Sequence, residues 1–487
     1  MLFNSLDFAI FLPVVFMIYW FVFQKSLNKQ NLFILFASYI FYAWWDWRFL
    51  ALIFFSSIVD FLIGIQIHST KLKTKRKILL LISILTNIGL LCYFKYFNFF
   101  IESFSHAFIF LGQDFNISRL DIILPVGISF YTFQTLSYTI DIYNHKLSPT
   151  RNIVQFLGFV SFFPQLVAGP IERASDLLPQ FSKKRFFRLE NGVDGMRQIL
   201  FGLFKKIVIA DTCAIYVNDV FSNYEIYSGM TLFLGGVLFA FQIYGDFSGY
   251  SDIAIGTSKL LGFRLSQNFA FPYFSRDIAE FWRRWHISLS SWFRDYIYIP
   301  LGGSKKGLFQ NIRNIFIVFT ISGLWHGANY TFLAWGLLHA LFFVPLVLLK
   351  KNRNHLEIIA KEELFPSLKE LFSVLLTFIL VVLGWILFRS NDIETATIFY
   401  KHIFKEILSI NSYFEVIKYI YYELGLTFLI TLIGFILLEY FGRRYKYGLG
   451  IINELPNPIV RKVIYIFIIS CVISYSHQDS PFIYFQF

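Results

Sequence analysis

The chain has 487 residues, of which 56% are hydrophobic and only 15% are charged. Ordinary soluble domains carry roughly 25% charged residues, and a soluble fold of this size could not cover so much apolar surface. The composition therefore excludes a soluble globular protein and predicts an all-α, polytopic integral membrane protein. The net charge of +12 fits the basic cytoplasmic loops of such a protein, so we expect no nucleic-acid partner.

Apolar segments recur along the whole chain, and many approach the roughly 18 residues that span a bilayer as a helix. Several fall short of a full span, so some are expected to be re-entrant or to lie partly in the interface. We predict about 11 transmembrane helices, the first of them retained because it lacks the features of a signal peptide. The clearest segments are Phe8–Phe23, Ile78–Phe97, Thr231–Tyr244, Ile312–Leu324, Tyr330–Leu349, Phe372–Phe388 and Leu426–Tyr440.

The basic residues predict the orientation of the chain. His68–Lys77 carries five Lys or Arg residues and no acidic ones, and basic loops of membrane proteins gather in the cytoplasm. Counting spans back from this loop also places Lys25–Lys29 inside, so the N-terminus is expected to be extracytoplasmic. The polar segments Asp176–Arg197 and Lys350–Lys369 are likewise expected at the cytoplasmic face.

No linker or repeat divides the sequence, so residues 1–487 are expected to form one membrane domain. Residues 1–110 form its N-terminal helices, residues 120–340 its catalytic core and residues 350–487 its C-terminal helices. The core interrupts its apolar segments with Pro and Gly, and broken backbone at membrane depth is tolerated where protein or a watery cavity satisfies it. Helix packing is the alternative explanation. The residues expected to line a cavity are Tyr244, Asp246, Tyr250, Trp325 and Asn329.

The segment Phe281–Tyr298 predicts a strongly amphipathic helix. At 100° per residue, its three tryptophans and His286 fall within about 120° of one another, opposite the charged residues. The aromatic side chains are typical of an anchor at the membrane interface. His286 is a titratable ring on the apolar stripe, which fits either a satisfied core histidine or a functional one.

The segment Ser322–Ala340 places His326 between two glycines in an apolar stretch. An ionisable residue within a membrane segment is a functional candidate by default, and glycine lets a substrate or another helix approach closely. On a continuous helix, Asn329 and Tyr330 would lie on the face of His326. His339, about 220° around such a helix, would point away, so we interpret it as structural.

The spacing of these histidines does not favour a metal site, because they lie 40 and 13 residues apart without an HExxH pattern or a carboxylate partner. Serine catalysis is weakly supported, because Gly245–Gly256 lacks the GxSxG spacing of a nucleophile elbow. General-base catalysis by histidine remains, since a neutral imidazole of ordinary pKa near ~6.5 can take a proton from a hydroxyl that attacks a thioester. No tightly bound cofactor is expected.

Five segments in order resemble the bacterial membrane-bound O-acyltransferase (MBOAT) superfamily, and the resemblance runs essentially end to end. It is strongest to the subgroup of alginate and related polysaccharide or peptidoglycan O-acetyltransferases. Tyr330 stands where that subgroup has Trp, a conservative aromatic change. The segments are LPVGISFYTFQTLSYTIDIY (124–143), FFPQLVAGPIERASDLLPQF (162–181), DFSGYSDIAIG (246–256), FWRRWHISLSSWFRDYIYIPLGG (281–303) and SGLWHGANYTFLAWG (322–336), and the C-terminal FIYFQF (482–487) fits the same subgroup.

The resemblance implies a fold of helices around a central tunnel, with His326 as the essential histidine and His286 as the second, upstream one. It implies transfer of an acetyl group from a cytoplasmic thioester, acetyl-CoA or an acyl carrier, to hydroxyls of an extracytoplasmic polysaccharide. The expected location is the bacterial cytoplasmic (inner) membrane, with an extracytoplasmic SGNH-type acetyltransferase as partner. The alternatives are a D-alanine/teichoic-acid-type export acyltransferase that uses a carrier-protein thioester, and a non-catalytic transporter.

Overall fold

The computed structural model describes residues 1–112, 120–167, 169–476 and 482–483. Every regular element in these residues is a helix and none is a strand, which confirms the predicted all-α class. The described chain packs as two compact units, residues 1–196 with 254–266 and residues 197–253 with 267–487. All the candidate site residues lie in the second unit, while the single membrane domain expected from the sequence stays a prediction.

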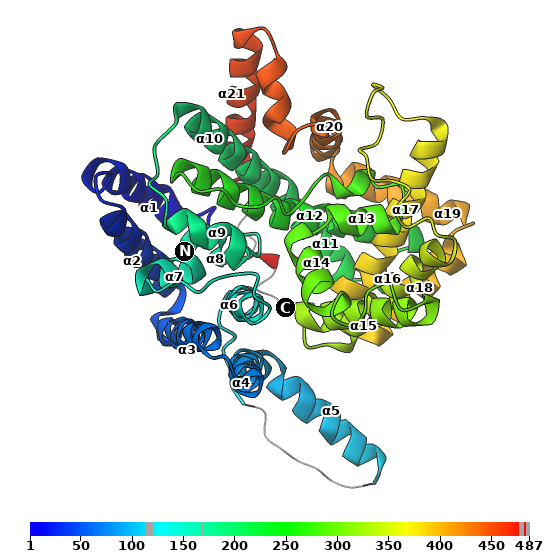
Figure 1. The fold of residues 1–487 in the computed structure, drawn as a ribbon. Helices are drawn as coiled ribbons and strands as arrows, with labels where there is room; N and C mark the ends of the chain where they lie inside the picture. The colour runs from blue at the N-terminus through cyan, green and yellow to red at the C-terminus, as the bar shows by residue number, and fades with distance from the viewer. Residues whose placement is uncertain (113–119, 168, 477–481, 484–487) are drawn as a thin grey trace. The chain divides into compact units, whose positions relative to one another are not determined.

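The first unit contains the N-terminal helices, drawn in blue to cyan in Figure 1. Its core includes polar bonds between α3 and α4, where the Asp60 carboxylate accepts hydrogen bonds from the Ser83 hydroxyl at 2.6 Å and the Asn87 amide at 2.7 Å. Such bonds satisfy polar groups that lipid could not. The helices are α1 (Leu6–Met17), α2 (Leu27–Asp46), α3 (Leu50–Ser69), α4 (Lys73–Leu91), α5 (Phe97–Phe110), α6 (Ile128–Tyr143), α7 (Ile153–Ser161), α8 (Phe163–Leu166) and α9 (Ala174–Phe181).

The second unit is built on α12, whose residues up to Ile253 belong to it, and on a hairpin of α15 and α16 that packs against α17. A seven-residue π-helix, Phe204–Ala210, joins α10 to α11. The helices are α10 (Leu189–Leu203, shared with the first unit), α11 (Asp211–Ser222), α12 (Gly229–Leu260), α13 (Ile278–Arg284), α14 (Ile287–Phe293), α15 (Leu308–His326), α16 (Tyr330–Leu348), α17 (Leu368–Arg389), α18 (Ile393–Glu406), α19 (Ile410–Tyr419), α20 (Leu426–Gly442) and α21 (Pro458–Tyr475).

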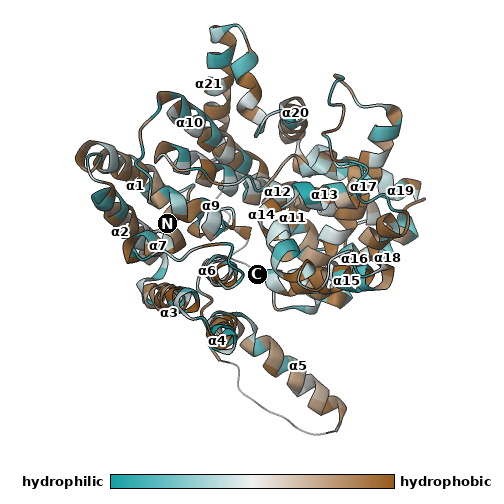
Figure 2. Ribbon diagram, in the orientation of Figure 1, coloured by the Kyte–Doolittle hydropathy of each residue, from teal (hydrophilic) through white to brown (hydrophobic). Residues whose placement is uncertain are grey.

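The apolar segments singled out in the sequence all fall on helices, to within one residue at their ends. Six helical runs in the described residues are long and apolar enough to cross a membrane, or seven if the bent pair Ile410–Leu424 and Leu426–Gly442 forms one span. One run, Leu27–Ser69, contains both α2 and α3, each of which reaches about 30 Å, the thickness of a bilayer core. Brown, hydrophobic residues run along α3 and α15 in Figure 2. The number of about 11 spans stays a prediction.

The amphipathic helix predicted over Phe281–Tyr298 is wrong as a continuous element. α13 ends at Arg284, and α14 starts at Ile287 with His286 at its N-cap in the left-handed conformation (φ 43°). A break of this kind in a non-glycine residue costs free energy and is kept only where surrounding contacts determine it. The contacts here are those of the His286 ring itself, described below.

The continuous helix assumed for the angles around His326 is not found, because α15 ends at His326 and α16 begins at Tyr330, in agreement with the separate apolar segments Ile312–Leu324 and Tyr330–Leu349. The ring of Phe332 packs against Gly327 so closely that a Cβ there would overlap it. Gly327 is extended (φ −164°), and Asn329 is the N-cap of α16. Asn329 and Tyr330 therefore do not share a helical face with His326.

Candidate active site

His326 is the last residue of α15 and is 4% exposed. Its ring is enclosed by three aromatic side chains, with centroid distances of 5.0 Å to Trp325, 5.1 Å to Trp335 on α16 and 5.2 Å to Phe388 on α17. All three meet the imidazole edge to face. Three helices thus hold this ring in an apolar enclosure.

His286 is fully buried, and its Nδ1 lies 3.0 Å from Oδ1 of Asn268. Phe247 of α12 packs edge to face on the ring at 4.6 Å, and Phe269 stacks on it at 6.4 Å. Its Nε2 has no hydrogen-bond partner among the described residues. Burial lowers the pKa of His286 to about 3, so the imidazole is neutral throughout the physiological range.

Trp325 connects the two histidines. Its indole lies 5.8 Å from the ring of His286 and 5.0 Å from that of His326. The break at His286 and the end of α15 at His326 therefore bring residues 40 positions apart onto one tryptophan, which neither segment alone predicted.

His339 belongs to the same aromatic cluster, contrary to the expectation that it points away from His326. Trp335 contacts both rings, at 5.1 Å from His326 and 5.0 Å from His339. The chain break at Gly327 resets the helix rotation, so the 220° calculated for a continuous helix does not apply. Nδ1 of His339 accepts a hydrogen bond from the indole N–H of Trp282 at 3.3 Å. This side chain has a packing partner on α13, as a structural histidine would.

The residues expected to line a cavity lie in different surroundings. The Tyr244 hydroxyl donates to the buried carboxylate of Glu439 at 2.5 Å, and the Tyr250 ring packs on Phe482 at 4.2 Å. Asn329 instead caps α16 through the Thr331 backbone N–H and donates to the Asn391 carbonyl at 2.8 Å. These contacts describe how each residue packs and do not trace a passage between them. The central tunnel implied by the resemblance therefore stays a prediction.

Asp246 belongs to a buried network of charges that sequence reasoning missed. Lys206 on the π-helix lies 2.7 Å from Asp211 and 2.9 Å from Asp246, and its neighbour Lys205 lies 2.5 Å from Asp252. Asp246 also accepts a hydrogen bond from the backbone N–H of Ile483 at 2.6 Å. Ile483 belongs to the C-terminal motif FIYFQF (482–487), of which the structure describes residues 482–483. Two adjacent lysines inside an apolar stretch were the available signal, since buried charges in membrane proteins are paired.

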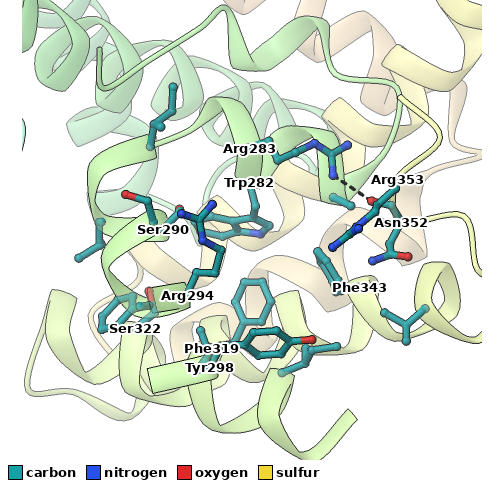
Figure 3. Close-up of a pocket in the computed structure, with 18 of the residues that line it drawn as sticks. Trp282, Arg283, Ser290, Arg294, Tyr298, Phe319, Ser322, Phe343, Asn352 and Arg353 are labelled. Carbon is teal, nitrogen blue, oxygen red and sulfur yellow. Dashed lines mark hydrogen bonds between the residues drawn. The ribbon is translucent and has the colours of Figure 1, made fainter. Parts of the chain in front are cut away.

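A cavity of about 420 Å³ lies beside the aromatic cluster, lined by residues of α13 to α16 and of the loop that follows α16. Trp282 forms part of its wall and also contacts Trp335 at 5.6 Å, so two packed tryptophans lie between the cavity and His326. Arg283, Arg294 and Arg353 also line this cavity and are labelled in Figure 3. The combination of cations with apolar walls suits a ligand that carries both phosphate and an apolar or neutral chain.

The long apolar helices are those of a multi-pass membrane protein, and the buried histidines form a candidate site between these helices. A family model described as MBOAT, membrane-bound O-acyltransferase family, matches residues 145–359. Over its whole length the chain is 36% identical to the whole of a probable alginate O-acetylase of Pseudomonas putida. It is 34% identical to a peptidoglycan O-acetyltransferase of Helicobacter pylori, over 81% of this chain and 78% of that protein.

The chain belongs to the membrane-bound O-acyltransferase family, as the resemblance implied, and it is an O-acyltransferase enzyme. A teichoic acid D-alanyltransferase of Bacillus subtilis is more distant, at 28% identity over 55% of this chain and 69% of that protein.

Proposed function

We propose that this enzyme moves an acetyl group from a cytoplasmic thioester, acetyl-CoA, across the membrane towards hydroxyls of an extracytoplasmic polysaccharide, with His326 as the general base. The observation that carries the proposal is that two buried imidazoles, His326 and His286, both pack against Trp325. A neutral imidazole in an apolar enclosure can accept a proton near neutral pH without first losing one. Names of relatives at 34% to 36% identity support acetyl as the acyl group.

The reaction needs one proton acceptor that later returns its proton. The oxygen of the acceptor hydroxyl attacks the thioester carbonyl carbon while the hydroxyl proton moves to His326. The tetrahedral intermediate then collapses, the carbon–sulfur bond breaks, and the imidazolium proton goes to the leaving thiolate. The products are an acetyl ester and free CoA thiol, and the histidine ends neutral as it began.

The cavity beside Trp282 is the proposed donor site. Arg353 lies on the loop after α16 that the charge distribution predicts to be cytoplasmic, which gives CoA access from that side. Arginine recognises phosphate through paired N–H donors, and the apolar walls suit the pantetheine chain. Arg283 has a second role, because it donates to the carbonyls of Asn352 and His355 at 2.9 Å each and so holds the loop in place.

Replacing Arg353 is therefore expected to weaken donor binding without changing the chemistry. Arg353→Ala should raise the KM for acetyl-CoA about ten-fold or more with a nearly unchanged kcat, because a charge-assisted hydrogen bond to phosphate contributes about 1.5–3 kcal/mol. Initial rates of CoA release at varied acetyl-CoA concentration measure both constants. Lys361→Ala is the matched control, since this lysine lies on the same loop, pairs with Glu357 and does not line the cavity. A kcat loss with unchanged KM in Arg353→Ala would contradict the donor assignment.

The final acceptor is proposed to be a polysaccharide hydroxyl, to which a separate extracytoplasmic SGNH-type acetyltransferase passes the acetyl group. The names of the alginate and peptidoglycan relatives support this class of acceptor. The D-alanine alternative has weaker support, because the D-alanyltransferase match covers 55% of this chain. Membership of an enzyme family argues against the non-catalytic transporter.

The proposed orientation in the bacterial inner membrane has the N-terminus outside and the loop His68–Lys77 inside. Leu72, the N-cap residue of α4, is 70% exposed and reports on that loop. In a background with the three native cysteines replaced, Leu72→Cys should react with a membrane-impermeant maleimide only after the cells are opened. Labelling in intact cells would reverse the assignment.

A further inference from the structure

The side chain of Asn268 contacts His286 and three further polar groups. Its Oδ1 lies 2.9 Å from the Ser288 hydroxyl and 3.3 Å from the Ser288 backbone N–H, besides 3.0 Å from Nδ1 of His286. Its Nδ2 lies 3.4 Å from the Ser251 hydroxyl on α12. Asn268 is itself fully buried, and its backbone carbonyl accepts the N–H of Ile287 at 2.9 Å. One side chain therefore joins α12 to the turn that carries His286.

The backbone N–H of Ser288 decides which end of the amide faces the histidine. An N–H can only donate, so the amide atom facing it must be the acceptor oxygen, and a flipped Asn268 would set two donors against each other. Because Oδ1 accepts, Nδ1 of His286 must carry the proton that it shares with Asn268. A neutral imidazole has one N–H, so Nε2 is the unprotonated nitrogen with an available lone pair.

Nε2 of His286 is a buried acceptor without a partner in the described residues. Buried polar groups in native proteins nearly always have partners, and an exception calls for a ligand or water as the missing one. We propose that Asn268 is a positioning residue that holds His286 in its Nδ1–H tautomer, so that Nε2 accepts a hydrogen bond from a substrate hydroxyl or amide. This proposal rests on the acyl transfer proposed above and assigns His286 a binding role beside the base His326.

The chemistry of Nε2 limits the ligand that it can accept. A lone pair attracts an O–H or N–H group and repels a carboxylate or phosphate oxygen. The side chains that contact the ring are Phe247 on α12, Phe269 beside Asn268, and Trp325 on α15. Among the ionisable groups on these elements, His326 shares Trp325 with His286, and the α12 carboxylates of Asp246 and Asp252 are each paired with a lysine. The proposed ligand is therefore the hydroxyl of the acceptor or an amide of the donor.

The test replaces the acceptor oxygen by a carboxylate. In Asn268→Asp, the same three donors can be satisfied, but the negative charge favours the imidazolium and raises the pKa of His286 towards or above its ordinary value of ~6.5. Activity of this variant should fall about ten-fold between pH 7.5 and pH 5.5, because protonated Nε2 cannot accept, whereas the parent should change far less. Asn268→Leu should lose activity at every pH without a new acid limb. The assay is CoA release from acetyl-CoA as a function of pH.

A matched control separates this effect from any buried carboxylate. Asn314 on α15 is also fully buried, and its amide donates to the Gly303 carbonyl at 3.0 Å without contacting either histidine. Asn314→Asp should keep the pH profile of the parent. An Asn268→Asp profile that parallels the parent, or an Asn268→Leu variant as active as the parent, would overturn the positioning role.

A second readout does not depend on the donor. In the parent, the folded pKa of about 3 lies below the unfolded value of ~6.5, so folding stability is lost as pH falls below about 6.5. Raising the folded pKa in Asn268→Asp removes this loss. The apparent melting temperature of Asn268→Asp relative to the parent should therefore rise as pH falls from 7.5 to 5.5. A parent without acetyl-CoA activity would refute the proposed donor alone, whereas a constant difference in melting temperature would refute the contact between Asn268 and His286 on which the positioning role rests.

Discussion

His326→Gln is expected to lower acetyl transfer by about 10²- to 10⁴-fold while the protein remains folded and inserted. Glutamine keeps hydrogen-bonding capacity and similar bulk among Trp325, Trp335 and Phe388, but it cannot take up a proton near neutral pH. General-base assistance supplies rate factors of this size, so the loss should appear in kcat and not in the KM for the donor. The measurement is initial-rate kinetics on purified variant at matched expression.

His339→Gln is the matched control, because it makes the same change at a buried histidine of the same aromatic cluster. The amide can still accept from the Trp282 indole, the contact made by Nδ1 of His339. We expect a loss below about ten-fold, in line with a packing role. If His326→Gln acetylates like the parent, or if His339→Gln loses more activity than His326→Gln, then His326 is not the base.

Lys206→Met is expected to be the most damaging single change to stability, at about 3–5 kcal/mol. The lysine side chain is 1% exposed and lies between Asp211 and Asp246, which are 2% and 3% exposed. Removing it leaves two carboxylates buried without their cation, and an uncompensated buried charge has a cost of this size. The measurement is denaturant-induced unfolding of the purified protein in detergent micelles.

Lys259→Met is the control for this loss. Lys259 pairs with Asp194 at 2.6 Å, but these side chains are 18% and 37% exposed, and such pairs contribute about 0–1 kcal/mol. Lys206→Met in combination with Asp246→Asn should recover part of the stability, because one unpaired charge is then removed. Equal stability of the two single lysine variants would show that the buried network does not hold α12 to the π-helix.

The fold class could be predicted from composition, because a chain with so few charged and so many apolar residues exposes apolar surface that only a membrane can cover. The segments Ile312–Leu324 and Phe372–Phe388 fall inside α15 and α17 for the same reason. The helix break at His286 could not be predicted, because its partner Asn268 is 18 residues away. The break at Gly327 falls between two segments that the sequence had separated, but the close packing of the Phe332 ring on Gly327 appears only in the fold.

The candidate site was predicted in part. His326 and His286 were selected from their apolar surroundings, and the structure brings both onto Trp325. Asn268 had no signal in the sequence, since a single amide in a loop 18 residues before His286 resembles any other loop residue. Lys206 was missed although two adjacent lysines in an apolar stretch were a signal, and only the fold shows that two carboxylates from α11 and α12 meet it.

The most direct test of acetyl transfer uses sealed inside-out membrane vesicles that contain the enzyme, its SGNH-type partner and the polysaccharide acceptor. Acetyl-CoA labelled in the acetyl group is added outside, to the face that was cytoplasmic. The account predicts acetylated polymer inside the vesicles, release of one CoA per acetyl group transferred, and neither product with His326→Gln. Labelled polymer formed equally by His326→Gln, or no labelled polymer and no CoA release from the parent enzyme, would contradict it.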